Sequence, residues 1–528
     1  MTAVLSLAFL CSYRAFLLHC VHMFQLNAYK PGVQLRWTMK NKGDYLRRNI
    51  LILPIFPLLL TPMGENSLSL VCSGFFLAQW YVNRPRQAKK PLVCTNRVKR
   101  MLATHGIFLA AILFSLFLTE SLRVQGICLA AAHLLVPGFV LLADGVNMPL
   151  EKFINRRCVQ DAKRKLREHP GLIVLGVTGS YGKTSTKFFL HKLLSIKYDV
   201  LMTPESFNTT LGVVRTVREE LKPFHEVFIC EMGARNLGDI AEICDIVKPR
   251  CGVLTSIGPQ HIESFKSLEN VVKAKFELPD ALPGDGAFFL NLGNPNIRAE
   301  YVRRGQSGHA QSGHTVTYGF SDDCGYQARN VVTSGEGSSF FVRMPDFTEM
   351  SFETKLIGAH NVENILAAIA VADFLGVQRS LIAAGVRKLE SVPHRLQLIR
   401  HGKDLLIDDA YNSNAAGAKA ALDVLAMFGG CKILVTPGMI ELGAKESELN
   451  EKFGAQASEV CDFVVLVGKR QTERIRKGLM DAGYPEEKIF VAGGLFQGLA
   501  KVSELDAGGR QKVVLLENDL PDNYLGGL

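Results

Sequence analysis

A glycine-rich turn between an apolar run and a helical segment carries the clearest chemistry in this sequence of 528 residues. Residues 172–179, LIVLGVTG, have the composition of a buried strand, and the helical stretch KFFLHKLLSI follows at 187–196. Glycines between them let backbone N–H groups face phosphate oxygens, and the start of a helix favours negative charge. Strand, glycine turn and helix in this order predict a phosphate-binding loop, which comprises Gly179, Ser180, Gly182, Lys183, Thr184 and Ser185.

Two side chains of this turn have functional groups suited to a nucleotide. Lys183 can neutralise the β- and γ-phosphates, and the Thr184 hydroxyl can coordinate Mg²⁺. The common spacing GxxxxGK[ST] would place its first glycine at Val177, so the turn follows the narrower pattern TGSxGKT[ST]. An ordinary glycine turn is the alternative, which the flanking strand and helix disfavour.

A second apolar run ends in an acidic residue. Residues 227–230, VFIC, have the composition of a buried strand and lead into Glu231. Open α/β sheets bind ligands in the crevice at the carboxyl ends of their strands, where a carboxylate can hold a metal. Many strands end in an acid, so it is the combination with the phosphate loop that indicates a metal ligand.

The elements that must position these residues follow an alternating pattern. From about Leu172 onward, short apolar runs alternate with amphipathic segments of helical length. This alternation predicts an α/β fold in which helices flank a parallel sheet. The chain is long enough for two or three domains, each with a core of its own.

Apolar residues make up 48% of the chain and crowd into its first 150 residues, which indicates a membrane region. The formal net charge of +10 lies largely in short loops between apolar stretches, so membrane topology explains it better than a nucleic-acid partner, and none is expected. The twelve cysteines include no CxxC pair, so neither a zinc ribbon nor a disulfide framework is predicted.

Five apolar stretches of the first 150 residues predict about five membrane helices. A crossing needs about 20 residues, so the second and fourth stretches are short, and prolines at 54, 57 and 62 weaken the second; four crossings are the alternative. The stretches are residues 2–23, 50–64, 68–82, 106–119 and 124–143.

The charges of the connecting loops predict the orientation. Loops 24–49 and 83–105 hold six and seven Lys or Arg residues, and the turns near Glu65 and Glu120 hold few charges. Because Lys and Arg stay in the cytoplasm, the N-terminus is expected outside and everything after Ala143 inside. The predicted location is the inner (cytoplasmic) membrane, multi-pass, with the catalytic domains in the cytoplasm. Arg14 falls inside the first stretch, where it either meets an anionic lipid headgroup or snorkels to the interface.

Nine ordered motifs carry a resemblance to a known family. They are TGSYGKTS at 178–185, FNTTLG at 207–212, EMGARNLGDI at 231–240, IGPQHIESF at 257–265, KAKFEL at 273–278, GAHNVENILAA at 358–368, HRLQ at 394–397, DDAYNSNAAGAKAAL at 408–422 and GMIELG at 438–443. In this order they resemble the Mur ligases of bacterial cell-wall synthesis, and most of all the branch that adds D-alanyl-D-alanine to a UDP-muramoyl-tripeptide.

The resemblance implies a central Mur-ligase-like P-loop ATPase domain at 151–392 and a Rossmann-like C-terminal ligase domain at 393–528, and the apolar stretches predict a transmembrane region at 1–150 before them. In the family a soluble domain that grips the UDP of the substrate stands first. Here the membrane stretches occupy that place. The resemblance therefore implies the chemistry and leaves the acceptor open.

The resemblance also implies roles for single residues. Lys183 and Thr184 would bind the triphosphate and Mg²⁺, with Glu231 on the metal and His261 on a second Mg²⁺. Lys275 aligns with a lysine that many Mur ligases carry as a metal-binding carbamate; the alternative is an unmodified or salt-bridged helix lysine. The other implied contacts are Asn361 and Asn364 with adenine, Arg395 with the γ-phosphate, Asp409 with ribose, and Asn412 and Asn414 with the incoming amine.

The activity that the resemblance implies is ATP-dependent, ADP-forming joining of an acid to an amine. ATP and Mg²⁺ are the expected cofactors, and the acid is a peptidoglycan-precursor-like or lipid-linked substrate that accepts an amino acid or dipeptide; membrane lipid is a further partner. Three alternatives stay open: a polyglutamate-type ligase, a P-loop ATPase-driven transporter or sensor, and an inactive scaffold. The glycine-rich segment 305–314 is expected to be a flexible surface loop.

Overall fold

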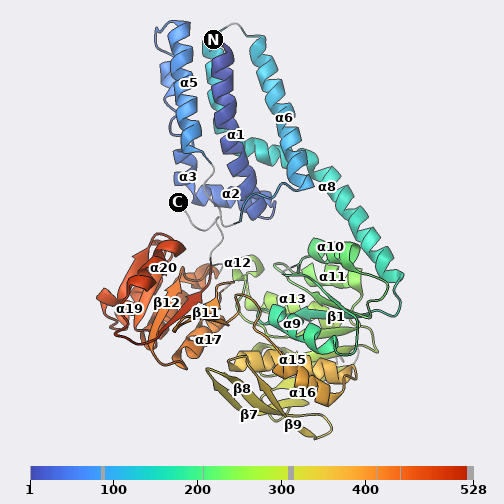
Figure 1. The fold of residues 1–528 in the computed structure, drawn as a ribbon. Coiled ribbons are helices and arrows are strands. Elements are labelled where there is room, and N and C mark those ends of the chain that lie inside the picture. The colour runs from blue at the N-terminus through green and yellow to red at the C-terminus, as the bar shows by residue number, and fades with distance from the viewer. Residues whose placement is uncertain are drawn as a thin grey trace. The chain divides into compact units, whose positions relative to one another are not determined.

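The computed structural model describes residues 2–84, 90–119, 121–205, 207–306, 314–411, 413–440 and 442–519. Most of the loop expected at 305–314, residues 307–313, lies outside this described part, as does Asn412. The chain forms two compact units, one that extends to Arg156 and one from Arg157 to Asp519 (Figure 1). The first unit is all helical and the second has two mixed sheets, so the predicted all-α region before an α/β part is confirmed.

Long apolar helices build the first unit. Phe9 and Tyr13 of α1 are buried, with Phe9 against Phe76 of α5, and α1, α5 and α6 run along one another in Figure 1. Tyr13 also hydrogen-bonds His105 of α6, with 2.7 Å between Oη and Nε2. The helices are α1 (Thr2–Leu26), α2 (Pro31–Lys40), α3 (Lys42–Arg47), α4 (Ile55–Leu58), α5 (Glu65–Val82), α6 (Asn96–Phe117), α7 (Leu122–Leu134) and α8 (Val136–Arg167), the last of which continues into the second unit.

The five apolar stretches do not all become long helices. Among the described residues, two helices, Val4–Leu26 and Asn96–Leu116, are long and apolar enough to cross a membrane, and α7 with α8 would make a third if that pair, bent by 68°, is one span. The second stretch forms only α4 and a series of tight turns, because prolines at 54 and 57 lack N–H donors. Five crossings therefore stay a prediction. Arg14 lies exposed on α1.

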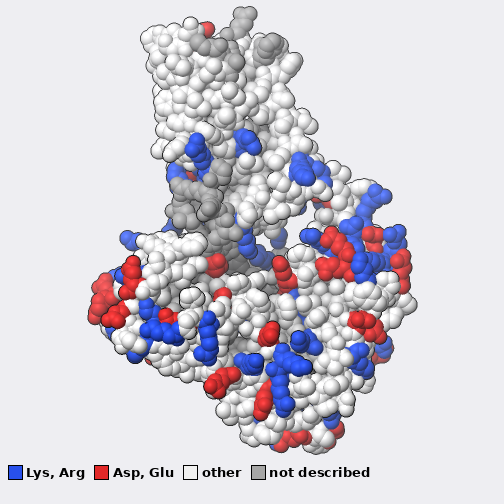
Figure 2. Space-filling model, viewed as in Figure 1, with Lys and Arg blue, Asp and Glu red and all other residues white. Residues whose placement is uncertain are grey.

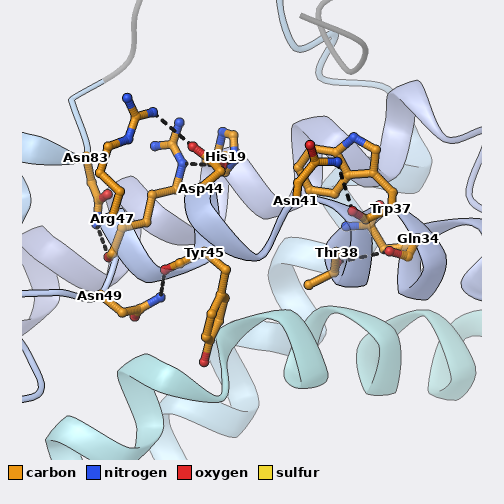
Figure 3. A network of polar contacts seen from close by, with 11 residues as sticks. His19, Gln34, Trp37, Thr38, Asn41, Asp44, Tyr45, Arg47, Asn49 and Asn83 are labelled. Atoms are coloured by element: carbon orange, nitrogen blue, oxygen red, sulfur yellow. Dashed lines mark hydrogen bonds and ion pairs between the residues drawn. The ribbon is translucent and has the colours of Figure 1, made fainter. Parts of the chain in front are cut away.

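Polar contacts join α1, α3 and α5 at one end of this bundle (Figure 3). The Asp44 carboxylate accepts hydrogen bonds from Arg47 at 2.9 Å and Arg48 at 3.0 Å, and it lies 3.3 Å from His19. The Asn83 side chain donates to the Arg48 carbonyl at 3.1 Å. Arg47 at the end of α3 and Arg48 directly after it are thus held in place.

A nine-stranded sheet organises the central part of the second unit. Its order is β2-β3-β1-β4-β5-β6-β7-β8-β9, parallel as far as β7 and antiparallel after it. The chain runs from β1 to β2 and β3 on one side, and the connection from β3 then crosses β1 to reach β4 on the other side, so the carboxyl end of β1 is a topological switch point. The strands are β1 (Ile173–Thr178), β2 (Val200–Met202), β3 (Val227–Glu231), β4 (Cys251–Leu254), β5 (Ala287–Asn291), β6 (His314–Gly319), β7 (Tyr326–Ser334), β8 (Gly337–Arg343) and β9 (Glu349–Thr354).

Helices cover both faces of this sheet, and each face has a core of its own. On one face lie α9 (Lys183–Leu194), α15 (Ala359–Phe374) and α16 (Arg379–Arg387). On the other lie the end of α8, α10 (Thr210–Glu220), α11 (Asp239–Val247), α13 (Leu268–Asp280) and α14 (Pro295–Gln306), with the short α12 (Ile262–Phe265) before α13. The predicted strand–loop–helix at 172–196 and the strand before Glu231 are confirmed as β1, α9 and β3.

A six-stranded sheet forms the rest of the second unit, in the order β10-β11-β15-β12-β13-β14, with only the β10–β11 pair antiparallel. The predicted boundary at 392/393 falls between α16 and β10; the three-part division stays a prediction. The elements are β10 (Gln397–His401), β11 (Asp404–Asp409), α17 (Ala415–Ala426), β12 (Cys431–Thr436), η1 (Gly443–Lys445), α18 (Glu446–Ser458), β13 (Phe463–Val467), α19 (Glu473–Asp481), η2 (Glu486–Lys488), β14 (Ile489–Ala492), α20 (Leu495–Glu504) and β15 (Lys512–Glu517).

Candidate nucleotide and metal site

The loop between β1 and α9 needs glycine at two positions. Gly179 has φ 150° and Gly182 has φ 79°, in the region that favours glycine. A Cβ at 179 would lie 2.1 Å from the Thr255 hydroxyl, and one at 182 would lie 2.4 Å from Oδ1 of Asn364. The loop can therefore pack against Thr255 and Asn364 only because both residues lack a side chain.

The segment after β4 supports the loop from one side. The Ser180 N–H donates to the Ser256 carbonyl at 2.7 Å, and the Tyr181 N–H donates to the Ser256 hydroxyl at 3.1 Å. The Ser180 hydroxyl donates to the Gly258 carbonyl, also at 3.1 Å. Ser180 is thus occupied in holding the loop, whereas Ser185 is half-buried in the first turn of α9.

Lys183 folds back over the loop that it follows. Its ammonium donates to the carbonyls of Gly179 at 2.7 Å and Ser180 at 3.1 Å. Burial and, to a smaller extent, the Arg395 charge lower the pKa of Lys183 to about 8, against the opposing effect of the Glu231 charge. The ammonium is thus positioned where phosphate oxygens would replace the two carbonyls.

Glu231, at the carboxyl end of β3, is fully buried and contacts the loop helix. Its Oε1 accepts hydrogen bonds from the Thr184 hydroxyl at 3.2 Å and from the Asn208 amide at 3.1 Å. Its Oε2 lies 3.1 Å from the ammonium of Lys187, an ion pair without hydrogen-bond geometry. The structure thus brings together the predicted metal ligands Thr184 and Glu231.

Lys275 and His261 lie on separate elements. Lys275 is buried in α13, and burial together with the Lys183 charge holds its pKa well below the ordinary value. A neutral amine is the form that reacts with CO₂, so these surroundings suit a carbamate. His261 precedes α12 with a positive φ of 53°. Within the described residues no group of three or more His, Cys, Asp or Glu is gathered for a metal, so the second metal site stays a prediction.

Asn361 and Asn364 begin α15, three residues apart on one face. The Asn364 Oδ1 accepts from the Thr186 hydroxyl at 3.2 Å and lies against Gly182, which puts it at the loop. Asn361 donates to the Ile357 carbonyl at 2.8 Å.

Arg395 and Asp409 lie near each other at the start of the six-stranded sheet. The Leu396 N–H donates to Asp409 at 3.2 Å, and the Arg395 guanidinium is 4.3 Å above the Tyr411 ring. Burial raises the pKa of Asp409 to about 6, and burial lowers the pKa of Arg395. Asn414 caps α17 through its Oδ1, which accepts from the N–H groups of Ala416 and Gly417, and its predicted contact with the amine stays a prediction.

These residues fit a magnesium nucleotide. The glycine loop is closed to any side chain at two positions, an ammonium lies over it, and a buried carboxylate faces a hydroxyl at its edge. A glycine loop and an ammonium are suited to phosphate oxygens, and a buried carboxylate offers the oxygen donors that a hard cation binds. Lys183, Thr184 and Glu231 would hold the group.

Comparison with known proteins places this site in a family. The Mur ligase middle domain matches residues 177–372, and the Mur ligase glutamate ligase domain matches residues 394–516. The UDP-N-acetylmuramoyl-tripeptide–D-alanyl-D-alanine ligase of Escherichia coli (strain K12) is 30% identical over 341 residues, which are 62% of this chain and 72% of that protein. The chain belongs to the Mur ligase family.

Two further similarities show how much of the chain aligns with Mur ligases. The Bacillus subtilis (strain 168) enzyme of the same description is 33% identical over 314 residues, 59% of this chain but only 65% of that protein, less than two thirds of its length. The structure of MurF ligase from Thermotoga maritima in complex with ADP has a TM-score of 0.61 at 25% identity and covers 70% of this chain and 81% of that one. Both family models of this Mur ligase lie within residues 177–516.

Several contributors to the Mur ligase site were not predicted as site residues. Lys187 and Asn208 both contact Glu231, and Glu517 is buried beside Asp409 at the paired ends of β15 and β11. For Lys187 a signal existed, since it follows Lys183 by one helical turn. For Asn208 and Glu517 the contacts join segments distant in sequence, and spacing carries no signal of that kind.

Proposed function

We propose that this Mur ligase is a membrane-anchored, ATP-dependent amide ligase that acts through an acyl phosphate. The observation that carries the proposal is the loop with Lys183 over it and the Thr184–Glu231 pair at 3.2 Å beside it. Bound Mg²⁺ would supply charge stabilisation for the transferring phosphoryl group.

The proposed reaction has two steps, activation of the acid and attack of the amine. A substrate carboxylate attacks the γ-phosphorus of ATP, the bond to the β-phosphate oxygen breaks, and ADP and an acyl phosphate form. Lys183 and Arg395 stabilise charge on the phosphoryl oxygens. An amine then attacks the acyl carbon, phosphate leaves, and the amine loses a proton to give the amide.

The other residues orient the nucleotide. Asn361 and Asn364 would contact the adenine, Asp409 the ribose, and His261 and a carbamylated Lys275 a second cation. The low pKa of the buried Lys275 amine supports the carbamate.

We further propose a peptidoglycan-precursor acid as acceptor and an amino acid or dipeptide, such as D-alanyl-D-alanine, as amine. Similarity to ligases of that description supports this choice. A lipid-linked form of the acid is favoured by the apolar helices that precede the matched region. These helices also support a place in the cytoplasmic membrane.

Product identification tests the proposal. The full chain in detergent is incubated with ATP, Mg²⁺ and D-alanyl-D-alanine, with UDP-muramoyl-tripeptide, a lipid-linked muropeptide or a glutamyl acceptor as acid. Mass spectrometry should find a new amide and stoichiometric ADP with one of the two muropeptides. Turnover with glutamate and a glutamyl acceptor alone would assign a polyglutamate-type ligase, and ATP hydrolysis without any acceptor would favour an ATPase.

A further inference from the structure

Lys187 is a completely buried lysine that the proposed reaction does not use. Its exposed fraction is 0%, a rare situation for lysine unless its charge is compensated. It lies four residues after Lys183 on α9, so both side chains leave the same face of the helix. Thr186 and Phe189 beside it are buried as well.

The ammonium of Lys187 joins three elements. It lies 3.1 Å from Oε2 of Glu231 at the end of β3, and it donates to the Glu205 carbonyl, in the segment after β2, at 2.5 Å. The opposite carboxylate oxygen, Oε1, is held by Thr184 and Asn208. The Glu231 carboxylate is therefore fixed at both oxygens, and Lys187 supplies the only positive charge that the described ion pairs give it.

A buried carboxylate without a counter-charge is costly, and removal of one member of a buried ion pair leaves the other uncompensated. A hard cation binds to an anionic oxygen whose direction is set by its neighbours. Groups behind a metal ligand therefore influence metal affinity without touching the metal.

We propose that Lys187 is a positioning residue for the metal that accompanies the nucleotide. It holds Oε2 of Glu231, so that Oε1, beside the Thr184 hydroxyl, is the oxygen presented to the cation. This inference rests on the proposed function, because it assumes that Glu231 binds Mg²⁺.

The test compares ADP binding with and without Mg²⁺ in the full chain in detergent, measured with a fluorescent ADP. The variants are Lys187→Met, Glu231→Gln, the double variant and, as a control, Leu190→Ala, which removes buried side chain from the same helix. In EDTA all four should bind ADP as the wild type does. In the wild type, Mg²⁺ should increase the affinity for ADP. This increase should be smaller by about tenfold or more in Lys187→Met and in Glu231→Gln, and the double variant should show no greater loss than Glu231→Gln.

The control separates positioning from stability. Leu190→Ala should lower the melting temperature and keep the full Mg²⁺-dependent gain. If Lys187→Met does not fold, Lys187→Gln keeps a donor for the Glu205 carbonyl and should show the same loss.

Two results would overturn the inference while leaving the proposed function intact: a full Mg²⁺-dependent gain in a folded Lys187 variant, or a double variant in which the two losses add. If the wild type itself binds ADP equally with and without Mg²⁺, the proposed function fails together with the inference.

Discussion

Lys183 shows how one ammonium can serve both the folded loop and a ligand. Its bonds to the carbonyls of Gly179 and Ser180 satisfy a buried charge, and phosphate oxygens in their place would add charge to the same geometry. The ammonium makes these bonds charge-assisted already, and an anionic acceptor would add the attraction between opposite charges. Exchange of the carbonyls for phosphate oxygens would thus favour nucleotide binding.

Lys183→Met is therefore expected to abolish most of the activity. Loss of one such group from a preorganised site lowers kcat by about 10²–10³. ADP release coupled to a spectroscopic assay measures it, and circular dichroism checks the fold. Lys163→Met is the matched control, because Lys163 pairs with Asp245 at the surface of α8 and should leave the rate unchanged. Equal rates for both variants would mean that the nucleotide site has been misidentified.

Glu517 gives a pH-dependent stability. It is fully buried, the hydroxyls of Ser413 and Thr436 contact its two oxygens, and Asp409 lies opposite on β11. Burial, together with the Asp409 charge, raises the pKa of Glu517 from 4.5 to about 8. The folded protein thus keeps a proton that the unfolded chain releases, so the free energy of unfolding falls as pH rises from 4.5 to about 8.

Glu517→Gln removes that loss, because an amide has no proton to release. Between pH 6 and 7 the wild type should lose about 1.4 kcal/mol relative to the variant, and less for each further pH unit toward 8, visible as a steeper fall in melting temperature. Thermal unfolding at pH 6, 7, 8 and 9 measures this. Glu504→Gln, at an exposed position on α20, should melt in parallel with the wild type. Parallel curves for Glu517→Gln would show that the carboxyl is ionised in the fold.

At the scale of elements, the conformation of the phosphate loop depends on its glycines. Gly182→Ala would place a methyl group 2.4 Å from Oδ1 of Asn364 at φ 79°, so either the loop or α15 must move. Backbone strain of this kind costs about 1–3 kcal/mol, and we expect ADP affinity to fall about tenfold or more. Titration of fluorescent ADP measures it.

Gly402→Ala is the matched control for this change. Gly402 has φ 60°, and nothing lies within 4 Å of an added Cβ. Gly402→Ala therefore has the same kind of backbone strain as Gly182→Ala, but its methyl group meets no other atom. A similar affinity loss in both variants would assign the effect to stability instead of to the loop.

The sequence was sufficient for the elements that follow a local pattern. The strands β1 and β3, the glycine loop and the start of α9 were predicted because periodicity and turn residues are local signals. The contacts of Lys187, Asn208 and Asn364 were not, because each joins elements whose neighbours are set by strand order. The second apolar stretch, which the sequence marks as short and weakened by prolines, forms only the short helix α4 between turns.

At the scale of the whole molecule, basic residues gather at one end of the helical unit. Figure 2 shows this bundle almost free of Lys, Arg, Asp and Glu over most of its length, with basic side chains gathered at one end. Arg36, Lys40 and Arg47 of α2 and α3 and Arg97 of α6 belong to the loops that were predicted to be cytoplasmic. An apolar length that ends in basic residues is the pattern of a membrane protein with that end inside.

The orientation has a direct chemical consequence, because ATP is available only in the cytoplasm. Cys94, exposed before α6, lies in a loop expected inside, and Asn66, exposed at the start of α5, lies at a turn expected outside. In a background where Cys11, Cys128 and Cys158 are serine, an impermeant maleimide should label Cys94 only after cells are permeabilised. Asn66→Cys should be labelled in intact cells. Labelling of Cys94 in intact cells would place its loop outside; with alternating crossings the basic segment after residue 143 would follow it, and the proposed ligase would have no ATP.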